Sequence, residues 1–229
     1  MLLTGTYFYA TYRSVTFSQG QKEPTGMRKD INLQGCCDAA DGPRKKASDR
    51  IFETALELFY QRGIRAVGVD EIVCQAGVTK PSLYRSFESK DALVAACLES
   101  FAAEGMAELD AMIEAAGPAP QAKLRAIIAH MAAELEEPGF RGCLMSNAAV
   151  EFRDEGHRGR QVIDSCKAKF RARLSGIVND LGADDPEGLV DGLTLLIEGA
   201  YSSHLVFGKR GPASSFVQTA ERLIAAHMK

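Results

Sequence analysis

Apolar residues recur every three or four positions along most of the chain after residue 47, a spacing that places them on one face of an α-helix. In the first such stretch Ile51, Ala55, Leu58 and Phe59 share a face, and the glycine that follows is a common helix stop. The pattern predicts three short helices, at 48–62, 69–76 and 79–87.

A much longer apolar stripe follows these helices. It runs from residue 89 or 91 to about 116 and ends at a Gly-Pro pair, which does not continue a helix. Segments rich in glycine and proline divide the rest of the chain into five further predicted helices, at about 120–136, 143–154, 158–181, 187–207 and 213–228. The strict alternation of a strand is not found, so we expect an all-α protein with an N-terminal three-helix unit and a C-terminal helical bundle.

The first 46 residues contain several glycines and prolines and no sustained apolar period, so we expect a flexible tail over 1–46. A first domain is then predicted over 47–92 and a second over 93–229. The start of the chain lacks the basic and apolar regions of a secretory signal, and no apolar run approaches the roughly 18 residues of a membrane span. We expect a cytoplasmic protein with no membrane partner.

Composition narrows the picture further. Hydrophobic residues make up 46% of the chain and charged residues 25%, which is ordinary for a globular protein. Residues 41–90 carry nine Lys/Arg against seven Asp/Glu, whereas residues 91–229 carry fourteen against twenty, so only the first part is compatible with a surface that faces phosphates. The six cysteines lack paired C-x-x-C spacing, and we expect neither a metal site nor a cofactor.

The segment from residue 69 to residue 90 has the features of a helix-turn-helix. Its two short helices need a tight turn, for which Gly77 supplies a backbone conformation that other residues resist. The first turns of the second helix would then enter the major groove of DNA, which accommodates an α-helix. We expect exposed side chains there to contact base edges, namely Lys80, Ser82 and Arg85, and others to contact phosphates, namely Thr79, Ser82, Tyr84 and Lys90.

The same residues carry a resemblance to a known family. They include Ala55-x-x-Leu58-Phe59, Gly63, Val69-x-x-Ile72, Ala76-Gly77-Val78, Leu83-Tyr84-x-x-Phe87 and Ser89-Lys90-x-x-Leu93. Together they are similar to the DNA-binding domain of the TetR family over about fifty residues, from Ile51 to Leu98. Members often place Ser or Thr where this chain has Gly68, which is the weaker N-cap by a few tenths of a kcal/mol.

The resemblance implies roles for individual residues. Lys80, Pro81, Ser82 and Arg85 match positions that meet bases or adjacent phosphates, and Tyr84 and Lys90 match positions that hold phosphates. The alternative is that the apolar members are only the core of a small bundle and the charged members a solvated face. The complete order of the set favours DNA binding.

The last two predicted helices are both amphipathic. Two such helices at a chain end can form a four-helix interface with a two-fold mate, and the resemblance favours this homodimer. The alternative is that they only close the core of the single chain. The candidate dimerisation residues are Leu193, Ile197, Tyr201, Phe216, Leu223 and Ile224.

Candidate ligand-binding residues lie on the middle helices. Apolar lining can come from Phe101 and Phe170, and embedded polar groups that can orient a ligand are His130, Asn147, Glu151 and Glu198, although each can equally be an ordinary core residue.

A short segment over residues 141–147 carries a second resemblance. It is similar to a segment in one subset of the TetR family, in which the cysteine matching Cys143 can sense electrophiles or oxidants. A nearby helix N-terminus and Arg141 would both favour a thiolate there. The alternative is a small buried packing residue.

The sequence therefore predicts a ligand-responsive transcriptional repressor. It would bind a palindromic operator in double-stranded DNA as a homodimer and be released by an unidentified small molecule or electrophile. The main alternative is an all-helical transferase that uses His130 or Cys143, but no nucleophile–base pairing, phosphate-binding glycine loop or metal spacing supports an enzyme. A protein-interaction module is the third interpretation, and a mobility-shift assay separates it from a DNA-binding protein.

Overall fold

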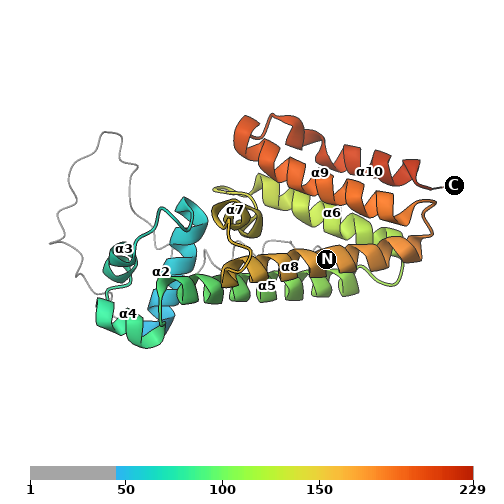
Figure 1. Cartoon of the computed structure of the whole chain (residues 1–229). Helices are drawn as coiled ribbons and strands as arrows, with labels where there is room; N and C mark the ends of the chain where they lie inside the picture. Colours follow the sequence, from blue (N-terminus) through green and yellow to red (C-terminus); the bar gives the residue numbers. More distant parts are fainter. Residues whose placement is uncertain (1–44, 229) are drawn as a thin grey trace. The chain divides into compact units, whose positions relative to one another are not determined.

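The computed structural model describes residues 45–228, and every regular element in this range is helical (Figure 1). The predicted all-α class is therefore confirmed. The described residues form two compact units, 45–97 and 98–228, and the division falls inside the long helix α5 (Lys90–Ala115), near the boundary predicted between residues 92 and 93. The predicted tail lies outside the described residues, apart from residues 45 and 46.

The first unit is built on α2 (Ala47–Arg62), α3 (Val69–Gln75) and α4 (Lys80–Ser86), and both α3 and α4 pack on α2. The apolar face predicted on α2 is buried, as are Ile72 of α3 and Leu83 of α4. Burying a side chain of this size stabilises a fold by about 1.5–3 kcal/mol, so these few residues are enough to fix α4 against α2 and α3.

The second unit contains the rest of α5 and the helices that follow it. None of the helices within residues 45–228 is long and apolar enough to cross a membrane. After α5 the elements are α6 (Pro120–Glu136), α7 (Leu144–Glu151), α8 (Arg158–Leu181), α9 (Pro186–Phe207), the 3-10 turn η1 (Pro212–Ser215) and α10 (Phe216–Ala226).

Helix α9 is central to the packing of this unit, because it contacts both α8 and α10, while α6 contacts α8 and α10 and α7 contacts α8 (Figure 1). Asp185 starts α9 by accepting a hydrogen bond from the amide of Gly188 at 3.0 Å. The side chains at the centre of the unit are at most 1% exposed and include Leu124, Ile127, Leu174, Leu189 and Leu193.

The last predicted helix differs in its first turn. The prediction was one helix over 213–228, but η1 precedes α10. In η1 the amide of Ser214 donates to the carbonyl of Gly211 at 3.0 Å, and the Ser214 hydroxyl donates to the same carbonyl at 2.8 Å. This local side-chain bond favours the tighter turn over an α-helical start.

Candidate functional site

The connection between α3 and α4 has the geometry of a helix-turn-helix. Gly77 adopts a φ of +60°, in the left-handed region that residues with a side chain rarely adopt. The amide of Gly77 donates to the carbonyl of Cys74 at 3.1 Å, and the amide of Val78 donates to the carbonyl of Val73 at 2.9 Å, as in a Schellman C-cap. The role predicted for Gly77 is confirmed.

Arg50 of α2 braces this turn. Its Nη1 donates to the carbonyls of Ala76 at 2.9 Å and Gly77 at 3.2 Å. A guanidinium at the carboxyl end of α3 also interacts favourably with the helix dipole. The Arg50 Nε is buried without a hydrogen-bond partner among the described residues, so the side chain is held by its outer nitrogen.

The N-terminal half of α4 presents polar side chains to solvent. Thr79 occupies the N-cap position predicted for it, but its hydroxyl shares a hydrogen bond with the Ser82 hydroxyl at 3.0 Å and caps no backbone amide. The Tyr84 side chain is 51% exposed, whereas Leu83 beside it is fully buried. The exposed residues predicted to contact DNA are Thr79, Lys80, Pro81, Tyr84 and Arg85, and Ser82 is partly exposed.

Lys80 is held by a carboxylate of the neighbouring helix. Its Nζ lies 2.6 Å from Oδ1 of Asp70, and the two side chains are 52% and 74% exposed. The hydrogen bond to Asp70 and the negative charge of Asp70 raise the pKa of Lys80. An ammonium and a carboxylate therefore sit side by side where α3 and α4 both begin.

Lys90, predicted to hold a phosphate, also ties the first unit together. Its Nζ donates to the carbonyl of Ile64 at 2.7 Å and lies 5.9 Å from the centroid of the Phe59 ring, within cation–π range. These contacts join the start of α5 to α2 and the segment that follows it. A phosphate contact by Lys90 stays a prediction.

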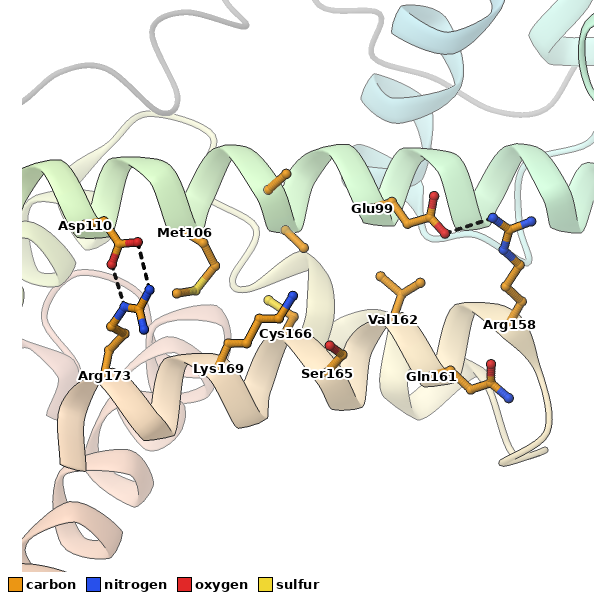
Figure 2. A pocket seen from close by; sticks show the side chains of 12 residues that line it. Glu99, Met106, Asp110, Arg158, Gln161, Val162, Ser165, Cys166, Lys169 and Arg173 are labelled. Atoms are coloured by element: carbon orange, nitrogen blue, oxygen red, sulfur yellow. Dashed lines mark hydrogen bonds and ion pairs between the residues drawn. The ribbon is translucent and has the colours of Figure 1, made fainter. Parts of the chain in front are cut away.

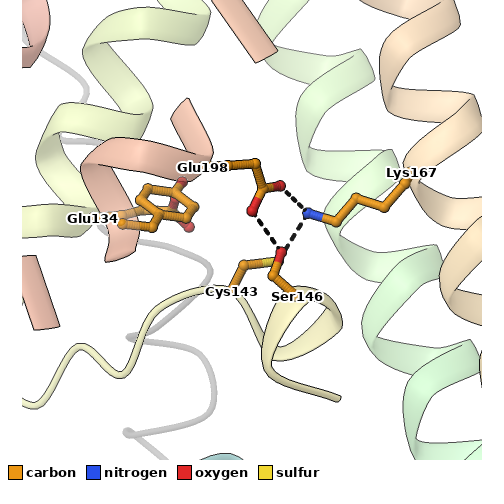
Figure 3. Close-up of polar contacts among 6 residues, drawn as sticks. Glu134, Cys143, Ser146, Lys167 and Glu198 are labelled. Atoms are coloured by element: carbon orange, nitrogen blue, oxygen red, sulfur yellow. Dashed lines mark hydrogen bonds and ion pairs between the residues drawn. The ribbon is translucent and has the colours of Figure 1, made fainter. Parts of the chain in front are cut away.

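A second group of polar side chains gathers where α7, α8 and α9 meet (Figure 3). Cys143 is the residue before α7, and Nζ of Lys167 on α8 lies 3.4 Å from its Sγ. The same ammonium is 2.5 Å from one carboxylate oxygen of Glu198 on α9, and the other oxygen accepts a hydrogen bond from the Ser146 hydroxyl at 2.8 Å. We call Cys143, Ser146, Lys167 and Glu198 the thiol cluster.

Lys167 keeps its charge in this cluster. Burial favours the neutral amine, but Cys143 and Glu198 together outweigh burial, so the pKa of Lys167 is raised. The Lys167 ammonium thus lies within hydrogen-bond distance of the Cys143 sulfur. Burial raises the pKa of the Cys97 thiol to about 12.

His130 lies in a separate, half-buried group of titratable residues. Its Nε2 is 3.9 Å from Glu134, whose carboxylate accepts a hydrogen bond from the Tyr201 hydroxyl. Burial raises the pKa of Glu134 and of nearby Glu108 and lowers the pKa of His130. The Tyr201 ring packs edge-on against Phe140 at 5.2 Å between centroids, and both rings pack against the core of the second unit.

A cavity of about 580 Å³ lies between α5 and α8 (Figure 2). An ion pair flanks it at each end: Glu99 with Arg158 at 3.0 Å, and Asp110 with Arg173 at 2.6 Å. Its volume is within the range of about 300–1,000 Å³ typical of small-molecule sites. Between the ion pairs the lining includes the small or apolar side chains of Ala102, Ala103, Met106 and Val162.

Comparison with known proteins decides what the first unit is. Residues 51–97, from α2 to the early part of α5, match the family described as bacterial regulatory proteins, tetR family. The chain belongs to the TetR family. It is a transcriptional regulator with a DNA-binding helix-turn-helix.

Similarity to individual TetR-family proteins extends into the second unit. The regulator AcuR of Cereibacter sphaeroides is 29% identical over an alignment of 196 residues that covers 77% of this chain and 84% of AcuR. The activator FasR of Mycolicibacterium smegmatis is 37% identical over 81 residues, which are 35% of this chain and only 33% of FasR. The structure of SCO4454, a TetR-family regulator from Streptomyces coelicolor, superposes with a TM-score of 0.72 at 27% identity, over 80% of this chain and 96% of that protein.

None of the seven residues predicted to bind or sense a ligand lines the cavity between α5 and α8. Cys143 and Glu198 belong to the thiol cluster, and the Asn147 amide donates to the carbonyl of Arg141 at 2.7 Å, which fixes the segment before α7. His130 lies in the half-buried titratable group. The other three are half-buried side chains, namely Phe101, Glu151 and Phe170. Their contact with a ligand stays a prediction.

The six predicted dimerisation residues divide into two groups. Leu193, Ile197 and Phe216 are buried within the single chain, while Tyr201, Leu223 and Ile224 are half-buried against the same core. Helix α9 also exposes apolar side chains, which the helical pattern of the sequence did not predict. Four exposed residues of α9 follow one another at intervals of three or four positions and so share one face of the helix. We call this set the α9 stripe: Leu195, Gly199, Ser202 and Val206.

Proposed function

We propose that this TetR-family regulator is a repressor that binds a palindromic operator as a homodimer and leaves it when a small molecule or an electrophile acts on the 98–228 unit. The observation that carries the proposal is the helix-turn-helix itself. Its turn at Gly77 is braced by Arg50, and α4 holds a polar face outward. Such a face fits the major groove, where the first turns of a recognition helix meet base edges.

The exposed residues of α4 divide by chemistry into two roles. Lys80 and Arg85 carry several hydrogen-bond donors each and are suited to the acceptors of guanine. Tyr84 has an exposed phenol beside a fully buried leucine, and its hydroxyl is suited to donate to a phosphate. Phosphate contacts position the protein without reading sequence, so the two groups predict different mutant behaviour.

The α9 stripe supports the homodimer. Leu195 and Val206 are 73% and 72% exposed, and Gly199 between them has no neighbouring atom within 4 Å of where a side chain would begin. Small residues between apolar ones allow two helices to approach closely, and a second copy of the chain presents the same stripe. A two-fold dimer presents two α4 helices, and it therefore reads a palindromic site.

The cavity between α5 and α8 supports a small-molecule effector. A ligand there would change how α5 packs against α8, and α5 continues into the 45–97 unit. An operator with half-sites about 34 Å apart requires a defined separation of two α4 helices, so a few ångströms of change weakens simultaneous docking. No contact between ligand and DNA is needed.

The thiol cluster supports an electrophile as the alternative effector. The Cys143 thiolate would add to the β-carbon of an activated alkene, forming a C–S bond while the π electrons move to the α-carbon, which then takes a proton from solvent. The adduct would displace Lys167 from the sulfur and disturb its pair with Glu198, which lies on the helix that carries the α9 stripe.

Repression is the direction that we propose for this regulator. The relative DhaR of Mycobacterium sp., 30% identical over 108 residues, is named a transcriptional repressor, whereas FasR is named an activator. A repressor released by its effector must bind that effector more weakly when operator is bound, by the same factor by which the effector weakens operator binding, typically about 5- to 150-fold. This reciprocity separates direct release from indirect control.

The decisive experiment is selection of operator fragments by the full-length protein, followed by mobility shift with single variants. Tyr84→Phe should weaken binding to all duplexes alike, because it removes a donor to a phosphate. Arg85→Ala should instead relax the preference for one base pair in each half-site. Operator binding should also lose affinity steeply as salt increases, since phosphate contacts release counterions.

Two outcomes would contradict the proposal. The first is a protein that binds no duplex selectively at low salt. The second is a set of Tyr84 and Arg85 variants that all bind like the wild type, which would place the DNA surface elsewhere. Paired titrations of a releasing compound, with and without operator, complete the test, since equal affinity in both would exclude direct release.

A further inference from the structure

The ion pair between Asp70 and Lys80 has no role in the function proposed so far. Asp70 is the second residue of α3 and Lys80 the first residue of α4, and their charged atoms are 2.6 Å apart. Both side chains are more than half exposed, and exposed ion pairs contribute little to stability. The pair therefore calls for an explanation other than holding the two helices together.

A carboxylate is also out of place on this surface if the surface only binds phosphates. Asp70 is 74% exposed beside the residues of α4 that would face DNA, and its charge repels the phosphate backbone. The preference of helix N-termini for acidic residues does not require it, because Glu71 lies in the same turn. Glu71 already pairs with Arg62, so it is not the partner of Lys80.

We propose that Asp70 is a specificity-determining residue that reads a G·C base pair together with Lys80; this inference rests on the proposed DNA-binding function. Across the major-groove edge, a G·C pair offers two acceptors, guanine N7 and O6, followed by one donor, the cytosine N4 amino group. A lysine ammonium next to an aspartate presents donors followed by an acceptor. The Asp70–Lys80 pair complements that order.

The other base pair does not match this arrangement as well. An A·T pair offers an acceptor, a donor and then an acceptor, with the thymine methyl group beside the last. With the ammonium on adenine N7, the carboxylate can accept from adenine N6, but thymine O4 is left without a donor and the methyl group adds bulk. The pair should therefore discriminate G·C from A·T at one position in each half-site.

The same geometry gives Asp70 a second effect. While Lys80 is paired with Asp70, its charge is partly neutralised and is less available to a phosphate. Removing the carboxylate frees one ammonium, which can neutralise one more phosphate per subunit when DNA of any sequence is bound. Asp70 should thus lower affinity for non-operator DNA while raising selectivity for the operator.

The experiment compares wild-type protein with Asp70→Ala, Asp70→Asn and Lys80→Ala on operators that carry each base pair at each half-site position. In the wild type, G·C should be favoured at one position, and both Asp70 variants should reduce that preference by at least about 5-fold, the lower end of what a good two-point base contact gives. Preferences at other positions should not change. Non-operator binding by Asp70→Ala should strengthen, with a log–log salt slope steeper by about 0.9 for each phosphate gained.

Glu71→Gln is the matched control, because it removes one negative charge from the same turn of α3 but releases Arg62 instead of Lys80. It should leave the G·C preference intact. The double variant Asp70→Ala/Lys80→Ala should lose no more discrimination than Lys80→Ala alone, since the two groups act as one unit. Far-UV circular dichroism confirms that every variant is folded.

The outcomes separate this inference from the proposed function. If the wild type selects an operator but Asp70→Ala and Asp70→Asn keep every base preference, the inference is wrong while DNA binding stands. If the Glu71→Gln control loses the same preference, a general charge effect explains the result and the inference is again wrong. If the wild type selects no operator, the proposed function fails first.

Discussion

Replacing Arg50 by methionine should loosen the helix-turn-helix without unfolding the protein. Methionine keeps most of the apolar stem but removes the guanidinium that donates to the carbonyls of Ala76 and Gly77. A hydrogen bond to a charged group contributes about 1.5–3 kcal/mol net, and here both acceptors share one nitrogen, so we count one such contribution. The buried Nε without a partner offsets part of it, because removing an unsatisfied polar atom recovers roughly 1 kcal/mol. The net loss should be about 0.5–2 kcal/mol of local stability.

Hydrogen exchange measured by mass spectrometry on peptides within 69–88 reports this loss directly. The amides of Gly77 and Val78 are bonded across the turn, to Cys74 and Val73, and exchange only when it opens. A loss of about 0.5–2 kcal/mol should accelerate their exchange by about 2- to 30-fold. Operator affinity should fall by less, because the turn remains closed in most molecules.

Two variants test the reasoning. Arg50→Lys keeps the charge but replaces the planar fork by a single ammonium, so its exchange should lie between the wild type and Arg50→Met. Arg222→Met, an exposed substitution on α10, should leave peptides 69–88 unchanged. An Arg50→Met protein that is folded and exchanges at the wild-type rate over 69–88 would refute the bracing role of Arg50.

Three further outcomes follow from the second unit. Cys143 should react with N-ethylmaleimide before Cys97, whose pKa of about 12 leaves almost no thiolate near neutral pH, and equal labelling in peptide mass spectra would return Cys143 to a packing role. Leu195→Glu should weaken self-association measured by sedimentation, because it places a charge in the α9 stripe. A glutamate at the exposed position 111 of α5 should have no such effect. Equal effects of the two substitutions would show that the α9 stripe is not the dimer interface. Tyr201→Phe removes the hydrogen bond that opposes the burial-raised pKa of Glu134, so that pKa should rise further. A carboxyl with a raised folded pKa stabilises the folded protein at low pH, and this contribution is lost as pH increases from the ordinary pKa of 4.5 through the raised value. In urea unfolding measured against pH, the loss should extend to higher pH in the variant than in the wild type. Parallel curves for the two proteins would contradict this prediction.

Helical periodicity was sufficient to predict the architecture. The apolar faces of the helices, the glycine at the turn and the Gly-Pro stops are local features, and α2 to α9 lie within a few residues of the predicted ranges. The error at η1 came from a side-chain hydrogen bond to Gly211, which periodicity does not report. Periodicity also does not separate an apolar side chain that closes the chain's own core from one that awaits a partner. Leu193 and Leu195 lie on the same helix, yet one is 1% and the other 73% exposed.

The candidate site was predictable only where one segment of chain builds it. Residues of α4 follow one another directly, so their exposed face could be derived from the motif. The role of Arg50 was not predicted, because its guanidinium donates to the carbonyl of a residue 26 positions later in the sequence. The positive neighbour of Cys143 was expected to be Arg141, but Lys167, 24 residues away on another helix, supplies the ammonium at its sulfur. Contacts of this kind depend on tertiary packing, for which a single sequence carries no spacing signal.

The number of residues in α5 matters for rotation about the helix axis, because α5 passes from one compact unit to the other without a break at residues 97 and 98. Each residue added to an α-helix turns everything beyond it by about 100° and advances it by about 1.5 Å. One alanine inserted after Leu98 would therefore rotate one unit about the helix axis by more than a quarter turn, while seven inserted residues would bring it back to within about 20°. A chimera that joins the DNA-binding unit of one relative to the second unit of another is therefore constrained by the length of α5. A junction inside α5 preserves the arrangement only when the number of residues between the two units is unchanged or differs by about a whole number of helical turns.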